Sequence, residues 1–274
     1  MNKKWMYLLL LPGFLLVFVF LAVPLFFSMT PAFFPDGVFS LNLYRIFFTD
    51  AFYLQIFWRT IKIALITSCI CMLTGVPAAY FISRKKKSIR TVLIACTAFP
   101  LLTNSVVRAF AWITILGKNG VINAVLRGLG AKEPLQMLYT ESAVIAGSVY
   151  LFLPVMIASL TGVMEHIDDE LLEAAESLGA SQSSAFFKVA VPLCIPGLLV
   201  GSVMVFTGTA SAYTTPQLLG GNKNMVMVTL IYQQAITLGN WGNASAIAAL
   251  MAAMSAGIIA LMNRLALPFN RKGV

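Results

Sequence analysis

Long uncharged stretches alternate along the chain with short segments in which the charged residues gather. No residue is charged from Trp5 to Pro35, and similar runs extend from Ile63 to Ser83 and from Ser142 to Met164. A helix needs about 20 apolar residues to cross the hydrocarbon of a bilayer. Each of these runs is long enough, so the pattern predicts membrane-spanning helices rather than the amphipathic helices of a soluble fold.

Applied to the whole chain, this pattern predicts an all-α integral membrane protein with about six transmembrane helices. The expected spans are approximately 8–29, 61–83, 91–116, 142–164, 190–215 and 244–263. The apolar stretch Met225–Leu238 is 14 residues long, which is short for a span and suits an interfacial or re-entrant segment. A signal peptide is the rival interpretation of the first run, but that run is too long and no small-x-small cleavage site follows it.

Composition supports a lipid environment. The 274 residues are 59% hydrophobic and 11% charged, whereas about a quarter of the residues of a soluble domain are charged. The net charge of +9 does not indicate nucleic-acid binding, because the basic residues cluster at the ends of apolar runs, most densely from Arg84 to Arg90. No basic face interleaved with aromatic residues accompanies them, as a strand-binding groove requires.

The distribution of basic residues also predicts the orientation, since cytoplasmic loops of membrane proteins carry an excess of lysine and arginine. With the N-terminus in the cytoplasm, the inside segments hold most of the dense basic groups. These are Lys3, Lys4, the Arg84–Arg90 cluster, Lys188, Arg264, Arg271 and Lys272. The outer loops are sparser in basic residues. Both termini are therefore expected in the cytoplasm.

Enzyme chemistry and metal binding find little support. The four cysteines have the spacing of neither a zinc site nor a disulfide framework, so no metal site is predicted. His166 is the single histidine, and no carboxylate pair lies inside a span, so no catalytic residues are predicted. An ion-driven secondary transporter is the other transport class considered; buried ionisable relays and two similar halves would be expected of it, and neither is evident.

Six of the ten acidic residues lie between Glu165 and Glu176, in the expected cytoplasmic loop 165–189. The stretch has helix signals: Asp168 or Asp169 suits the N-cap, and Gly179 suits the C-terminus. One face then holds Leu171, Ala174, Ala175 and Leu178. From the residues alone, a solvated connector and a docking surface both stay open. The chain contains no Gly-x-x-x-x-Gly-Lys-Ser/Thr phosphate loop, so any ATP hydrolysis must occur on a partner.

Glu173-Ala174-Ala175, with Gly179 and then Val189-Ala190-Val191-Pro192, resembles the EAA loop of ABC-importer permeases. Valines stand where the family pattern usually has isoleucine and leucine, which keeps the apolar character. Other segments resemble spermidine/putrescine-type permease subunits: Phe99–Arg108, Gly120–Asn123, Tyr139–Thr140, Leu153–Pro154, Pro216–Gly221 and Asn240–Gly242. The similarity extends from about residue 40 onward.

The resemblance implies a type I ABC importer permease fold, with residues 1–274 as one transmembrane domain of a bacterial inner (plasma) membrane protein. It implies three kinds of partner: an ABC ATPase dimer, a second permease subunit that is homologous but not identical, and an extracytoplasmic substrate-binding protein. ATP and Mg²⁺ would bind to the ATPase, and no cofactor to this chain. Glu173 and Gly179 are implied as coupling residues, with Ala174 and Ala175 packing into the ATPase.

The resemblance favours a polyamine such as spermidine or putrescine as the solute. Relatives with the same machinery also carry other small solutes, among them amino-acid derivatives, phosphonates, iron and thiamine. No carboxylate lies inside an expected span, although a polycation should prefer an acidic or aromatic lining. Either the binding protein supplies the specificity or the solute is not a polyamine, and the sequence leaves both open.

Arg108 is a charge inside the expected third span. A basic residue at the bilayer centre costs about 2.5–3.5 kcal/mol, so such residues usually face a cavity or a partner. Arg108 is therefore a candidate for the translocation pathway or its gate, together with Thr103, Asn104 and Tyr213. Alternatively, Arg108 extends to the membrane surface, and the polar residues form hydrogen bonds between helices.

Overall fold

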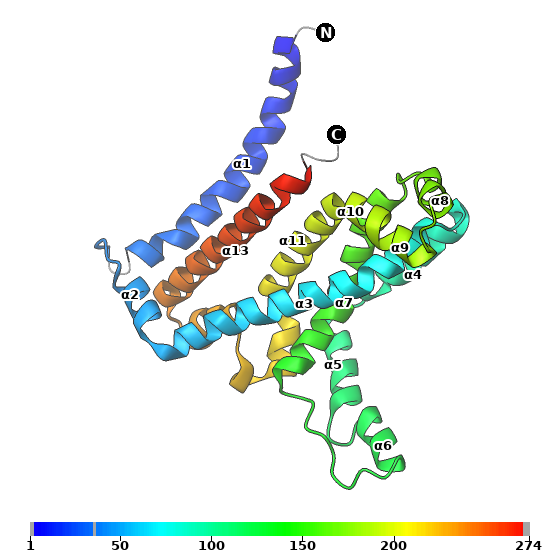
Figure 1. Ribbon diagram of the computed structural model, residues 1–274. Helices are drawn as coiled ribbons and strands as arrows, with labels where there is room; N and C mark the ends of the chain where they lie inside the picture. The colour runs from blue at the N-terminus through cyan, green and yellow to red at the C-terminus, as the bar shows by residue number, and fades with distance from the viewer. Residues whose placement is uncertain (1–2, 35–36, 271–274) are drawn as a thin grey trace. The chain divides into compact units, whose positions relative to one another are not determined.

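The computed structural model describes residues 3–34 and 37–270, with side chains from 11 to 264 within these ranges. Arg271 and Lys272, and the side chains of Lys3 and Lys4, lie outside this description. No strand occurs in the described part, and Figure 1 follows the helices along the chain. In chain order the elements are α1 (Lys3–Phe33), α2 (Asn42–Thr49), α3 (Ala51–Ser83), α4 (Lys87–Leu102), α5 (Ser105–Leu116), α6 (Val121–Gly128), α7 (Glu141–Met164), α8 (Asp169–Ser177), α9 (Gln182–Ala185), the π-helix η1 (Phe186–Ala190), α10 (Val191–Leu193), α11 (Ile195–Ser211), the π-helix η2 (Pro216–Gly220), the 3₁₀-helix η3 (Asn222–Asn224), α12 (Met227–Tyr232), the π-helix η4 (Gln233–Thr237) and α13 (Trp241–Asn270).

Among the described residues, five helical segments are long and apolar enough to cross a membrane, and a bent pair of helices raises the number to six. The segments are Leu11–Phe33, Ala51–Ser83, Ser105–Gly128, Glu141–Met164 and Trp241–Arg264, with Gln182–Leu193 and Ile195–Ser211 as the bent pair. Phe14, Phe20 and Phe26 of α1 are each more than 70% exposed, which lipid tolerates and water does not. The predicted fold class, an all-α membrane protein, is confirmed.

The segment 91–116, expected as one helix, is divided in the structure. The helix α4 ends at Leu102 and α5 begins at Ser105. The side-chain oxygen of Asn104 accepts hydrogen bonds from the amides of Val106 at 2.9 Å and Val107 at 3.4 Å. Asn104 thus caps a new helix.

The segment 190–215 is also not straight. Its two helical parts, Gln182–Leu193 and Ile195–Ser211, meet at an angle of 68°. Pro192 and Pro196 flank this bend, and prolines remove the backbone donors that would continue a helix. The chain therefore turns sharply just before it enters α11.

The residues divide into two compact units, of which the first comprises 1–55 and 230–253. Within it, the rings of Phe33 and Tyr44 lie 5.3 Å apart. A Cβ atom at Gly242 would lie 3.6 Å from the carbonyl oxygen of Pro31, so α13 begins in contact with the end of α1. A shallow apolar groove of about 450 Å³ lies beside this contact, and Trp241 is among the residues that line it.

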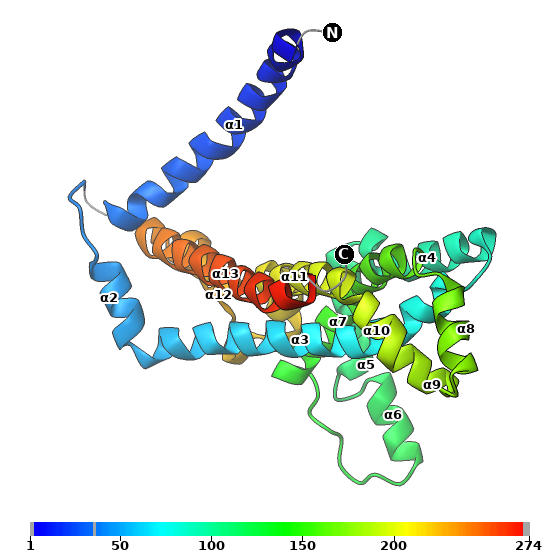
Figure 2. The same ribbon diagram turned by 45° about the horizontal axis from the view of Figure 1, so that its top comes forward.

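The second unit comprises residues 56–229 and 254–274, and its core lies between α3, α7 and α11. Met156 and Leu160 of α7 are fully buried there against Cys71 of α3. A Cβ atom at Gly75 would lie 2.8 Å from Cγ of Met156, so a glycine allows α3 to approach α7 closely. Within this unit, α8 and α9 lie at the C-terminal end of α3 (Figures 1 and 2).

Candidate functional site

The acidic loop 165–189 folds into two short helices, α8 and α9, and most of η1. Leu172 of α8 is buried in a small cluster with Ala185 and Ala190, and Tyr80 and Phe186 pack against it. Because this cluster holds one side of α8, the opposite side is free to contact a partner. Leu171 is 49% exposed, Leu178 is 90% exposed, and Glu173 and Ala174 are also exposed, whereas Ala175 is only partly so.

Gly179 ends α8 in the way that its residue type predicts. Its φ is +90°, a conformation that side chains rarely adopt. The amide of Gly179 donates to the carbonyl of Glu176 at 2.9 Å, and the amide of Ala180 donates to the carbonyl of Ala175 at 3.1 Å. These two bonds form a Schellman motif, which caps the helix and leaves the exposed Leu178 at its tip.

Two ion pairs anchor the loop to the preceding helices. Arg84 pairs with Asp169 and donates a hydrogen bond to the carbonyl of Ile167 at 3.0 Å, and Arg90 pairs with Glu165. Of the two residues predicted as N-cap candidates, Asp168 occupies the N-cap position, although its side chain makes no cap bond. Asp169 pairs with Arg84 instead. From the sequence, the basic cluster predicted only the orientation and not this anchoring role. The available signal was that the acidic loop and the basic cluster are expected on the same side of the membrane.

Arg108 is 9% exposed and lies beside the break between α4 and α5. Its Nη1 donates hydrogen bonds to the carbonyls of Pro100 at 2.8 Å and Thr103 at 3.3 Å. A helix break leaves such carbonyls without partners in their own helix. Arg108 satisfies them, so part of its hydrogen-bonding capacity is used within the chain.

Arg108 and Tyr213 line the same small cavity of about 300 Å³, together with Ser105, Phe152, Ser211 and Thr214. Thr103 and Asn104 are engaged at the helix break instead: the hydroxyl of Thr103 donates to the carbonyl of Phe99 at 3.0 Å, and Asn104 caps α5. The structure thus brings two of the four pathway candidates, Arg108 and Tyr213, together at one small cavity. The described residues hold no cluster of three or more potential metal ligands.

The family described as binding-protein-dependent transport system inner membrane component matches residues 71–272. The chain belongs to this family. The spermidine/putrescine transport system permease protein PotB of Haemophilus influenzae is 34% identical over 221 residues, which cover 80% of this chain and 77% of that protein. PotB of Escherichia coli is 32% identical over 235 residues, covering 84% and 85%. The molybdenum transport system permease protein ModB of Azotobacter vinelandii is 27% identical over 163 residues, covering 60% and 71%.

Solved structures show the same fold. A bacterial ABC transporter involved in the import of alginate matches with a TM-score of 0.78 and 19% identity, covering 97% of this chain and 96% of that chain. The alginate transporter in complex with its alginate-bound periplasmic protein matches with a TM-score of 0.82 and 17% identity, covering 97% and 95%. The chain is thus a multi-pass inner membrane permease subunit of an ABC importer and not an enzyme; the ATPase activity lies in a separate subunit.

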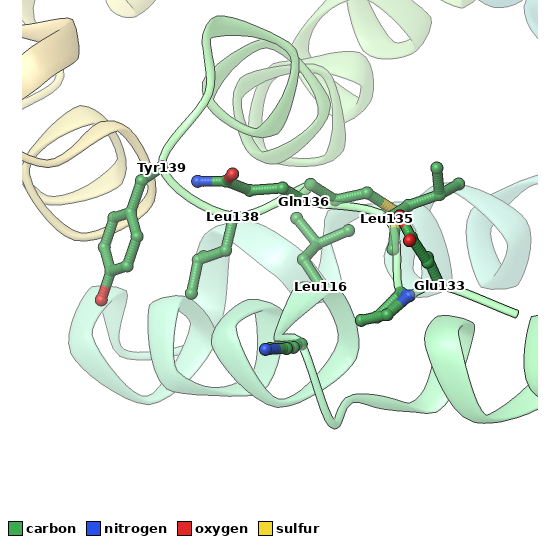
Figure 3. A pocket seen from close by; sticks show the side chains of 9 residues that line it. Leu116, Glu133, Leu135, Gln136, Leu138 and Tyr139 are labelled. Atoms are coloured by element: carbon green, nitrogen blue, oxygen red, sulfur yellow. The ribbon is translucent and has the colours of Figure 1, made fainter.

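The permease has a second structured region between α5 and α7. The loop from Glu133 to Tyr139 crosses a pocket of about 670 Å³, with Leu116 and Leu138 at the pocket (Figure 3). Asn123 of α6 is fully buried and holds this loop in place. Its amide nitrogen donates to the carbonyls of Gly117 and Leu135, both at 3.0 Å, and its oxygen accepts from the amide of Leu135 at 2.8 Å.

The segment 216–229 of the permease is fastened to α3 and to the start of α7. Arg59 donates to the carbonyl of Met225 at 3.2 Å, and the hydroxyl of Thr60 accepts from the amide of Met227 at 2.9 Å. Arg59 also pairs with Glu141 at 3.1 Å, and Lys62 pairs with the same carboxylate. Nothing in the sequence indicates these partners, because Arg59 and Glu141 are 82 positions apart.

Proposed function

We propose that this permease subunit forms, with a homologous second subunit, the pathway through which an ATPase dimer drives polyamine import. A substrate-binding protein on the opposite side of the membrane delivers the solute. The termini lie in the cytoplasm, on the same side as α8. Glu173, Ala174 and Gly179 belong to the surface that contacts the ATPase. Ala175 packs against the buried cluster around Leu172, which supports this surface.

The observation that carries the coupling role is the exposure of an apolar surface on an anchored helix. Leu171, Ala174 and Leu178 point away from the permease core while Leu172 points into it. Large exposed apolar side chains beside charged ones are typical of a protein interface. Ion pairs and the buried cluster hold α8 against the rest of the permease. A displacement of this surface by the ATPase is therefore transmitted to the permease and is not confined to the loop.

The similarity to PotB over 80% of the chain supports a polyamine as the solute. Arg108 does not contradict this assignment. Its Nη1 is used by the carbonyls of Pro100 and Thr103, so Arg108 has a structural role that requires no anionic cargo. The binding protein then supplies most of the specificity, and Tyr213 contributes an aromatic group to the wall of the cavity beside Arg108.

The test is ATP-driven uptake of radiolabelled spermidine by the complete importer in proteoliposomes. Glu173→Ala and Gly179→Arg should each lower uptake by at least about tenfold, the size of effect that follows the loss of a central interface residue. Both variants should still insert into the membrane. Co-purification of the ATPase with each variant measures whether the interface itself is weakened.

Glu176→Ala is the matched control for Glu173→Ala. Glu176 is also exposed on α8, but it lies one turn after the buried Leu172, on the anchored side of the helix. It should leave uptake nearly unchanged. Normal uptake by both Glu173→Ala and Gly179→Arg would exclude the coupling assignment, whereas ATP-driven uptake of another solute but not of spermidine would exclude only the polyamine.

A further inference from the structure

A single helix contacts both the α8 region and the segment 216–229. We infer that α3, packed along α7, transmits the displacement of α8 to the segment 216–229, with Arg84 and Thr60 as the positioning residues at its two ends. This inference rests on the proposed coupling role of α8. It adds the route by which ATP-driven movement on one side of the membrane reaches a structured segment on the other.

At the α8 end, the last turns of α3 are joined to the loop by polar and aromatic contacts. Arg84, just beyond the end of α3, pairs with Asp169 in the first turn of α8 and donates to the carbonyl of Ile167 at 3.0 Å. The guanidinium also lies 5.2 Å from the ring centroid of Tyr80, and that ring lies 4.7 Å from the ring of Phe186. A movement of α8 therefore displaces the end of α3.

At the other end, α3 holds the backbone of the segment 216–229. Thr60 is 2% exposed; its hydroxyl accepts from the amide of Met227 at 2.9 Å and donates to the carbonyl of Ile56 at 2.8 Å. Arg59 donates to the carbonyl of Met225 at 3.2 Å. Because these bonds are made to backbone atoms, they fix the backbone of the segment independently of its side-chain conformations.

The part of α3 between these ends is long enough and packed well enough to transmit movement. At 1.5 Å per residue, the 24 steps from Thr60 to Arg84 extend about 36 Å, which exceeds the hydrocarbon thickness of a bilayer. Cys71 of α3 is fully buried against α7, as is Met156 on the facing side. Close-packed interiors transmit strain instead of absorbing it.

The helix α7 supports the segment from a second side. A Cβ atom at Gly147 would lie 2.7 Å from Cδ1 of Leu219 and 2.9 Å from Cγ2 of Thr215. A Cβ atom at Gly220 would lie 2.9 Å from Cγ2 of Val144. With no space between them, α7 and the segment move together, so α3 and α7 act on the segment as one body.

Contacts alone do not demonstrate coupling, so the test measures whether ATP at one end changes the other end. Lys223 is exposed in the segment, and Lys223→Cys provides a labelling site for a membrane-impermeant maleimide. In the complete importer in nanodiscs, ATP with vanadate should change the labelling rate by about fivefold or more, a typical size for coupling between two sites. The importer without the introduced cysteine gives the background rate.

Arg84→Gln and Thr60→Val should each reduce this ATP-dependent change to less than about twofold, and the two together should do no more than either alone, since both interrupt one route. Arg84→Lys and Thr60→Ser should restore part of it. Lys87→Gln, which removes a charge from the same basic cluster, and Thr74→Val, at an exposed threonine of α3 bonded only to its own helix, should leave it intact.

An unchanged response in either Arg84→Gln or Thr60→Val overturns the inference, as does a parent importer that transports while Lys223→Cys shows no ATP response. A parent importer in which ATP drives no transport contradicts the proposed function instead. Arg59→Gln, which removes the bond to Met225 at the same end, replaces Thr60→Val if that variant does not assemble.

Discussion

The buried amide of Asn123 exchanges two hydrogen bonds with the backbone of Leu135, twelve residues later in the chain. Its nitrogen donates to the Leu135 carbonyl at 3.0 Å and its oxygen accepts from the Leu135 amide at 2.8 Å. By pairing with both the amide and the carbonyl of Leu135, the Asn123 side chain takes the place of the backbone partners that a helix or strand would provide. Asn123 of α6 therefore holds the loop over the pocket of Figure 3 at Leu135, and Asn224 donates to the carbonyl of Tyr139 at the end of the loop.

Asn123→Ala should loosen this loop. It removes three partly buried hydrogen bonds, and at about 1 kcal/mol each their loss lowers the free energy of unfolding by about 2–4 kcal/mol. Thermal unfolding of the purified permease should show the loss, and hydrogen exchange should become faster in residues 129–140. Asn222→Ala, at an exposed asparagine, should change neither measurement. Equal exchange rates in the Asn123 variant and the parent would show that other contacts hold the loop.

Gly147 should tolerate no side chain. In Gly147→Ala the new methyl group would overlap Leu219 and Thr215, and overpacking of this kind typically costs about 1–3 kcal/mol. The expected result is a lower unfolding temperature together with reduced transport, because the segment 216–229 is displaced from α7.

Two further variants give this prediction its control and its rescue. Gly162→Ala lies on the same helix with no atom within 4 Å of the added Cβ, so it should be neutral or slightly stabilising. Leu219→Ala makes space beside Gly147, so the double variant should be more stable than the sum of the two single changes predicts. If the losses of stability in the two single variants were additive in the double variant, steric overlap with Leu219 would not be the cause.

The apolar helices and the helix α8 were predictable from the sequence because each depends on local properties. Length and the absence of charge indicate a transmembrane helix, and the acidic run that ends at Gly179 indicates a capped surface helix. The pairing of Arg84 with Asp169 was not predictable, since the residues are 85 positions apart and several cations are equally close to the loop in sequence. One sequence gives no information on which of them pair.

The role of Arg108 was not predictable from the sequence for a different reason. The apolar pattern predicts 91–116 as one span, and in a continuous helix a buried arginine faces a cavity, a partner or the membrane surface. The structure has a break at Thr103 and Asn104, which frees the carbonyl of Pro100 for the guanidinium. Pro100 and Asn104 indicate the break, because proline interrupts helices and asparagine caps them. The length of the apolar run nevertheless favoured one continuous helix.

Arg108→Gln should destabilise the permease as well as slow it. Hydrogen bonds to charged groups contribute about 1.5–3 kcal/mol, and the two carbonyls would be left with a weaker donor or none. A residue that only lined the pathway would change transport without changing the unfolding temperature, so the two measurements separate the roles. Ser105→Ala, at a partly exposed serine that lines the same cavity, is the control and should preserve the unfolding temperature.

Gly179→Ala should weaken coupling through the backbone alone. The φ of +90° disfavours any side chain, and the cost of placing alanine in a left-handed conformation is about 1–2 kcal/mol. The added methyl group would touch nothing, because no atom lies within 4 Å of its position. The expected result is fraying of the last turn of α8, measured as faster hydrogen exchange at Leu178 and Ala180, with a moderate fall in transport. Gly128→Ala, where φ is not positive and the space is equally open, should have no such effect. If Gly179→Ala behaved like Gly128→Ala while Gly179→Arg abolished transport, Gly179 would matter for the space it leaves to the ATPase and not for the helix end that it forms.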